Sequence, residues 1–128
     1  MSTIKTVNAP GINPPAGHYS HAVVHNGVAY LAGQLPHVPG KPPGNPGSIA
    51  EQTAQVLANI EQALEACGSS RNKVLRCTVY VADISHWPEV NRVWADFFGS
   101  HKPARAVVPV KELHYGYALE VEVTAAVG

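Results

Sequence analysis

The fold is decided by residues 48–81, which read SIAEQTAQVLANIEQALEACGSSRNKVLRCTVYV. Ser48 and Glu51 have the spacing of a capping box, and apolar residues then recur with helical period as far as Gly68. Over residues 73–81 the pattern changes to strict alternation, which is typical of a half-buried strand. The apolar residues of this alternation are Leu75, Cys77, Val79 and Val81. The stretch therefore predicts a helix followed by a strand.

On the N-terminal side, two apolar runs at residues 21–25 and 28–32 flank the dipeptide Asn26-Gly27. Both residues of this dipeptide tolerate positive φ, so the pattern predicts an antiparallel hairpin with a two-residue turn. The run that follows, LPHVPGKPPGNPG at residues 35–47, is rich in Pro and Gly and predicts a loop.

On the C-terminal side, Ser85 and Pro88 mark the start of a second helix, and Gly99 marks its end. Two further strands are predicted at residues 105–110 and 119–127. Pro109 cannot donate a ladder hydrogen bond, so it places the strand at 105–110 at an edge or a bulge. In the strand at 119–127, apolar residues alternate cleanly with Glu120, Glu122 and Thr124.

The order of hairpin, helix, strand, helix, strand, strand predicts an α/β (α+β) two-layer sandwich, a single domain over residues 1–128. It has a mixed sheet with both helices on one face. We expect the other face to carry much Val and Ala and therefore to need a partner. Charged residues are only 14% of the chain, which also favours an oligomer.

Composition disfavours several kinds of partner and location. Nine Lys and Arg balance nine Asp and Glu, and no basic run occurs, so nucleic-acid and anionic-membrane partners are disfavoured. No apolar stretch has the length of a membrane span, and the start of the chain lacks the pattern of a signal peptide. We expect a cytoplasmic protein in which Cys67 and Cys77 are free thiols.

The common catalytic motifs are absent from the sequence: it has no glycine-rich phosphate loop, GxSxG, paired CxxC or HExxH. Seven histidines suggest a metal site, with His18, His21 and His25 close in sequence. On a strand, however, His21 and His25 would be about 13 Å apart, too far to share an ion. No metal is therefore expected.

Arg105 and Glu120 stand out because each lies among the apolar residues of a predicted strand, where an unpaired charge is costly. The planar guanidinium of Arg105 suits an anionic ligand. An ion pair of Arg105 with Glu120 or Glu122 is the alternative, which spacing alone favours.

Five groups of residues occur in one order across residues 8–127: Asn8-Ala9-Pro10; Tyr19; Gly33-Gln34-Leu35-Pro36; Val90-Asn91 with Phe97-Phe98; and Pro103-Ala104-Arg105 with Leu119-Glu120-Val121. In their order and spacing these groups resemble the RidA (YjgF/YER057c/UK114) family. Each group alone is weak evidence for the resemblance, but all five in the same order and spacing are hard to obtain by chance.

The resemblance implies a chorismate-mutase-like homotrimer with a cleft between each pair of neighbours. It also implies hydrolysis of 2-imino and 2-enamino acids, such as 2-iminobutyrate and 2-aminoacrylate, to 2-keto acids and ammonia without a cofactor. By the same resemblance, Arg105 binds the substrate carboxylate and Glu120 positions or activates water. Tyr19 and Asn91 line the cleft, and a backbone group of Gly33 contacts the ligand.

One residue departs from the family pattern, and one loop bears on the shape of the pocket. Ala32 stands where the family's deaminases usually have a hydroxyl residue, and the loop His114-Tyr115-Gly116-Tyr117 could shape the pocket for a bulkier imine. Three alternatives stay open: a pathway-specific deaminase for a larger enamine, a non-catalytic ligand-binding or chaperone-like trimer, and a purely structural role for Glu120.

Overall fold

The computed structural model describes residues 3–128 and arranges six strands in one sheet, in the order β1-β2-β3-β6-β4-β5. The strands are β1 Lys5–Val7, β2 Ala22–His25, β3 Val28–Leu31, β4 Val74–Val81, β5 Ala104–Pro109 and β6 Leu119–Ala126. Neighbouring strands are antiparallel except β4 and β5, which are parallel. The predicted mixed sheet is confirmed.

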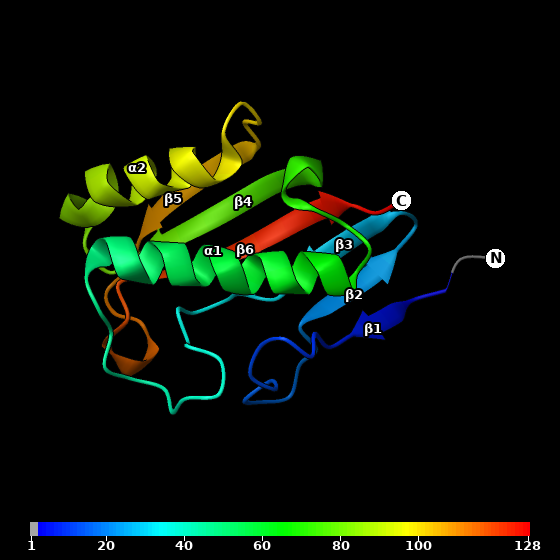
Figure 1. Ribbon diagram of the computed structural model, residues 1–128, viewed down its shortest axis with the longest axis horizontal. Helices are drawn as coiled ribbons and strands as arrows, with labels where there is room; N and C mark the ends of the chain where they lie inside the picture. The colour runs from blue at the N-terminus through cyan, green and yellow to red at the C-terminus, as the bar shows by residue number, and fades with distance from the viewer. Residues whose placement is uncertain (1–2) are drawn as a thin grey trace.

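Both long helices lie on the same face of this sheet, α1 over its middle and α2 beside it (Figure 1). Helix α1 spans Ile49–Ala66 and begins with the predicted capping box, in which the Ser48 side chain and the Glu51 side chain each accept from the other's backbone N–H. Helix α2 spans Trp87–Phe98 and ends at Gly99. Short 3-10 helices occupy residues 71–73, 84–86 and 114–116.

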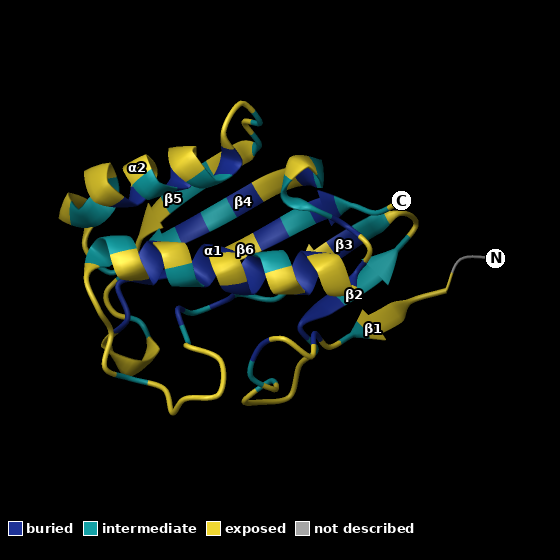
Figure 2. Ribbon diagram, viewed as in Figure 1, coloured by how far each residue is buried: buried dark blue, intermediate teal, exposed yellow. Residues whose placement is uncertain are grey.

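The hydrophobic core lies between the helices and the sheet, where dark-blue residues alternate along β4 and β6 (Figure 2). Leu119, Val121 and Val123 face the helices from β6 and are almost fully buried. Opposite them, α1 buries Val56, Leu57, Ile60 and Leu64, and α2 buries Val90, Trp94 and Phe98. The two-layer sandwich predicted from the element order is therefore confirmed.

The local turn predictions are also confirmed. Asn26 and Gly27 have φ values of 51° and 75°, and they join β2 to β3. Both residues lie in the left-handed region that a type I′ hairpin turn requires. Strand β5 lies at the edge of the sheet, so Pro109 removes no hydrogen bond from an inner ladder.

The prediction that Leu75 shares the buried face of β4 is wrong. The register with β6 shifts between Val74 and Arg76, so Leu75 is the extra residue of a bulge and is 49% exposed. A bulge inserts one residue and reverses the alternation on one side of it. Val74, which the alternation assigned to the other face, is buried instead. Strand β1, only three residues long, was not predicted.

The expectation of a Val- and Ala-rich uncovered face is wrong for the middle of the sheet. The register pairs Tyr30 with Thr124, Thr78 with Glu122 and Tyr80 with Glu120 on the face away from the helices. The valines and alanines of β6 and β4 mostly face the helices, so the polar members of each alternation remain outside. The Tyr80 hydroxyl donates to Glu122 Oε1 on this face, at 3.0 Å.

Three loops gather at one end of the sheet (Figure 1): the segment before β2, the segment between β3 and α1, and the turn before β6. Their convergence at the start of β6 encloses a cavity. Within residues 3–128, no helix combines the length and the apolar character needed to cross a bilayer.

Candidate functional site

The first wall of the cavity is the backbone that follows β3, which is attached to both layers of the fold. Gln34 exchanges two backbone hydrogen bonds with Val121 of β6, with N···O distances of 2.8 and 3.0 Å. The buried side chain of Asn59, on α1, donates to the carbonyl oxygens of Leu35 and His37. The chain from Gly33 to His37 is thereby held rigidly along the edge of the cavity.

Glu120 enters the same cavity from the second residue of β6. Because Leu119 and Val121 on either side of it face the core, strand alternation turns the Glu120 side chain to the opposite face. Partial burial raises the pKa of the Glu120 carboxyl, an effect that nearby His114 opposes and Glu122 reinforces. A carboxyl group with a raised pKa, placed in a cavity, is suited to accept and return protons.

Gly33 gives Glu120 the room to occupy this position. A Cβ atom at Gly33 would lie 2.5 Å from Glu120 Oε2 and 3.1 Å from its carboxyl carbon. Any larger residue at position 33 would therefore displace the carboxyl group. The resemblance assigned Gly33 a contact with the ligand, and the structure adds a steric reason for glycine there.

The opposite wall is formed by residues 8–20. His21, directly before β2, connects this segment to the sheet through hydrogen bonds. His21 is buried, and its Nδ1 accepts a hydrogen bond from the backbone N–H of Ala9 at 2.9 Å. The proton of the neutral ring is therefore on Nε2, which donates to the carbonyl of Asn13 at 2.9 Å. Burial lowers the pKa of His21 from its ordinary value, which agrees with the neutral form. Tyr19, half exposed, lies on this wall.

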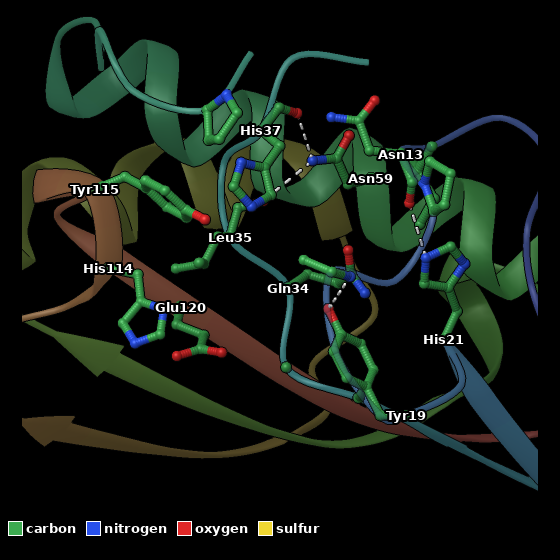
Figure 3. A pocket seen from close by; sticks show the side chains of 16 residues that line it. Asn13, Tyr19, His21, Gln34, Leu35, His37, Asn59, His114, Tyr115 and Glu120 are labelled. Atoms are coloured by element: carbon green, nitrogen blue, oxygen red, sulfur yellow. Dashed lines mark hydrogen bonds between the residues drawn. The ribbon is translucent and has the colours of Figure 1, made fainter. Parts of the chain in front are cut away.

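The cavity enclosed by these walls has a volume of about 410 Å³. In Figure 3, Glu120, His114 and Tyr115 lie together on one side of it and Tyr19 lies on the other. Three predicted site residues, Tyr19, Gly33 and Glu120, thus line one cavity. Ala32 lines it too, so a hydroxyl at position 32 would face the same space.

Arg105 and Asn91 lie in a different place, where β5 meets α2. Arg105 Nη1 donates to Asn91 Oδ1 at 3.0 Å. The guanidinium carbon lies 4.6 Å from the ring centre of Trp87 and 5.7 Å from that of Trp94. Stacking on the indoles and one hydrogen bond fix the guanidinium plane while leaving other N–H groups available for an anion.

The strand register shows that Arg105 and Glu120 point to opposite faces of the sheet. Arg105 pairs with Cys77 and Glu120 pairs with Tyr80, and Cys77 and Tyr80 are three residues apart on β4. Paired residues share a face and the faces alternate along a strand, so an odd separation reverses the face. The ion pair of Arg105 with Glu120 or Glu122 is therefore not formed; the ion pairs within residues 3–128 are Arg71–Glu61 and Arg92–Glu89.

The His21 ring and both cysteines are accounted for by local structure. Both ring nitrogens of His21 are engaged in hydrogen bonds, and no cluster of three or more metal-ligating side chains occurs in the described part of the chain. Cys67 and Cys77 are buried free thiols. Burial raises the pKa of Cys77 to about 12, outweighing the opposing effect of Arg105, so this thiol is not a nucleophile.

The sequence did not predict several residues that form the Glu120 cavity and the surroundings of Arg105. His37 and Asn59 carried no motif, and only the fold brings them to the cavity. Trp87 could have been found, because it lies four residues before Asn91 on the same helix and so shares its face.

Comparisons with family models and with known proteins point to the same family. The family model described as Endoribonuclease L-PSP matches residues 8–127. The protein HMF1 of Saccharomyces cerevisiae is 39% identical, with 98% of this chain and 97% of that protein covered. The 2-iminobutanoate/2-iminopropanoate deaminase of Bos taurus is 38% identical, with 98% of this chain and 89% of that protein covered.

Solved structures agree in fold. A protein of the conserved Rid family from Yersinia pestis, YyfA, superposes with a TM-score of 0.93 at 32% identity, covering 98% of this chain and 100% of the other. TdcF of E. coli, solved with bound serine, superposes with a TM-score of 0.89 at 26% identity, covering 97% and 99%. Members of this fold family thus include a protein that binds a small amino acid.

Proposed function

The chain belongs to the Endoribonuclease L-PSP family, to which the Rid and YjgF proteins belong, and from that premise we propose that it hydrolyses 2-imino and 2-enamino acids to 2-keto acids and ammonia. The observation that carries the proposal is Glu120, a carboxyl group with a raised pKa beside Gly33 in a cavity. The description of the family names a ribonuclease, but a chain without net charge is poorly suited to bind RNA.

The proposed chemistry needs few groups because an imine carbon is already electrophilic. Water adds to C2 of the protonated imine while Glu120 takes one proton from the water, which gives a neutral carbinolamine. Glu120 then returns this proton to the nitrogen, and the C–N bond breaks. As ammonia leaves, the C2 hydroxyl passes its proton to Glu120 and becomes the keto oxygen, and Glu120 transfers that proton to the departing ammonia, which leaves as ammonium. Correct placement of substrate and water supplies much of the acceleration in such a site.

The second part of the proposal is that each site forms between two subunits of a homotrimer. Arg105 on the edge strand β5 and Asn91 on α2 lie on the face of the sheet opposite to Glu120. Within one chain, Arg105 and Glu120 therefore do not contact the same small substrate. A neighbouring chain that places its β5 edge over the Glu120 cavity would complete the site. Arg105 would then bind the substrate carboxylate, and Tyr19, Gly33 and Asn91 would line the cleft.

Related observations support the rest of the proposal. TdcF binds serine, which has the carboxylate and nitrogen that a 2-imino acid also carries. The proposed residues perform the reaction by proton transfer and orientation, so the proposal includes no cofactor. Two buried free thiols suit a reducing compartment, and we therefore place the activity in the cytoplasm.

The test is hydrolysis of imines generated in situ. A threonine or serine dehydratase supplies 2-iminobutyrate or 2-aminoacrylate, and the release of keto acid and ammonia is followed with and without the protein. We expect acceleration proportional to the protein concentration. A protein that accelerates none of a broad set of imines, yet binds 2-keto acids, would be a ligand-binding module and would refute the proposal.

A further inference from the structure

One side of the Glu120 cavity is formed by three rings, which we call the aromatic wall: His37, His114 and Tyr115. The rings of His37 and Tyr115 meet edge to face, with centres 5.5 Å apart, and those of His114 and Tyr115 do so at 6.0 Å. Figure 3 shows His114 and Tyr115 on the same side of the cavity as Glu120. Leu35 adds an apolar side chain to this side of the cavity.

The wall is fixed from behind by Tyr117, which is 3% exposed. The Tyr117 hydroxyl accepts from the backbone N–H of Gly44 at 3.1 Å and shares a hydrogen bond with His37 Nδ1 at 3.2 Å. Asn59 holds the His37 carbonyl at 2.8 Å. Burial also lowers the pKa of His37, which keeps that ring neutral and suited to apolar contact.

Tyr115 occupies its position at a conformational cost. Its φ is 60° and its ψ is 17°, in the left-handed region, and Gly116 follows with a φ of 73°. A non-glycine residue persists there only when the surrounding structure imposes it. The Tyr115 side chain is half exposed, so burial within this chain does not compensate for that cost. What this backbone conformation does is place the Tyr115 ring at the edge of the cavity.

From this arrangement we infer that the preferred substrates are 2-imino acids with an aromatic side chain, which packs against the aromatic wall. The inference rests on the proposed function, because it places C2 of the substrate at Glu120 and the carboxylate at Arg105 of the neighbouring subunit. The side chain is the remaining substituent of C2, and the ring cluster beside Glu120 is the apolar surface available to it. A cavity of about 410 Å³ is within the range of sites for ligands larger than a four-carbon acid.

The experiment compares two imines made by the same L-amino-acid oxidase, with catalase present, from phenylalanine and from 2-aminobutyrate. Semicarbazide traps the imine that escapes hydrolysis, so suppression of the semicarbazone measures the enzyme. We expect kcat/KM of the wild type for the phenylalanine-derived imine to equal or exceed that for 2-iminobutyrate. The ratio of the two values is the quantity that reports on the aromatic wall.

Tyr115→Gly removes the ring and suits the left-handed backbone, so it tests the wall without adding strain. It should lower the ratio about threefold to tenfold, as expected for loss of an aromatic pair. Tyr115→Phe should leave the ratio unchanged. Asn45→Gly is the matched control, because Asn45 is also exposed with a φ of 52° but does not line the cavity.

Two results would overturn the inference while leaving the proposed function in place. One is a wild type whose kcat/KM is higher for 2-iminobutyrate than for the aromatic imine. The other is a Tyr115→Gly variant that loses activity equally toward both. Inactivity of the wild type toward both imines would overturn the proposed function and this inference with it.

Discussion

At the scale of single residues, the Glu120 carboxyl leaves no room for a Cβ atom at Gly33. Gly33→Ala places a Cβ 2.5 Å from Glu120 Oε2 and forces the carboxyl to move, while the backbone at Gly33 does not require glycine. We expect kcat/KM for imine hydrolysis to fall on the order of tenfold to a hundredfold, because small displacements of a reacting group are costly. Thermal unfolding should stay close to that of the wild type; activity equal to the wild type would show that the Glu120 position is unimportant.

Ala32, beside Gly33, is a position where we expect a substitution to raise activity. If the missing hydroxyl weakens a shared mechanism, Ala32→Ser adds a hydrogen bond of about 1 kcal/mol to substrate or water. Turnover of 2-iminobutyrate should then rise by up to roughly tenfold. Steady-state rates on that imine are the measurement, and an unchanged or lower rate would count against the account.

Arg105 is held by Asn91 and Trp87 in a geometry that lysine cannot copy. An ammonium group presents a point charge and cannot stack its plane on an indole while donating two parallel hydrogen bonds to a carboxylate. Arg105→Lys should therefore lose nearly as much kcat/KM as Arg105→Ala, on the order of a hundredfold. The two variants are compared after light scattering shows the same assembly as the wild type; full activity of Arg105→Ala would exclude the carboxylate contact.

At the scale of elements, the segment of residues 8–20 depends on a neutral His21. Protonation of Nδ1 would place its hydrogen against the N–H of Ala9, so the folded state binds this proton less readily than the unfolded state. Stability should therefore be complete above the ordinary histidine pKa of about 6.5 and decrease as the pH falls below it. Thermal unfolding against pH measures this, and amide exchange at Ala9 should locate it.

The control for this prediction is a side chain that does not titrate. His21→Gln should be less stable at every pH, because it loses the fit of both ring nitrogens, and it should lose the part of the pH slope that belongs to His21. An unchanged slope would show that other groups cause the pH dependence.

The same elements show what the sequence pattern could and could not predict. Helix α1, the hairpin turn at Asn26-Gly27 and the alternation of β6 follow from local periodicity and turn chemistry, so they were predictable. The bulge at Leu75 was not, because an extra residue leaves the apolar composition of β4 unchanged. Strand β1 has three residues, too few for alternation to be visible.

At the scale of the whole molecule, the sequence predicted candidate site residues but not how they are grouped. Which face of the sheet Arg105 and Glu120 occupy depends on the register between β4, β5 and β6, which the sequence of each strand does not specify. The resemblance implied both the candidate residues and a trimer, and the structure places the candidate residues in two groups, one in the Glu120 cavity and one at the Arg105 edge. A site completed by two chains reconciles the two.

Subunit mixing tests this central claim most directly. Arg105→Ala and Glu120→Gln are each prepared as inactive proteins, dissociated, mixed in equal amounts and reassembled, with reassembled wild type and each variant alone as controls. If each site combines Glu120 of one subunit with Arg105 of its neighbour, random assembly restores about a quarter of the sites, and imine hydrolysis returns to about that fraction of the wild-type rate. A mixture that stays as inactive as its parents, while the reassembled wild type is active, would contradict a site shared between subunits.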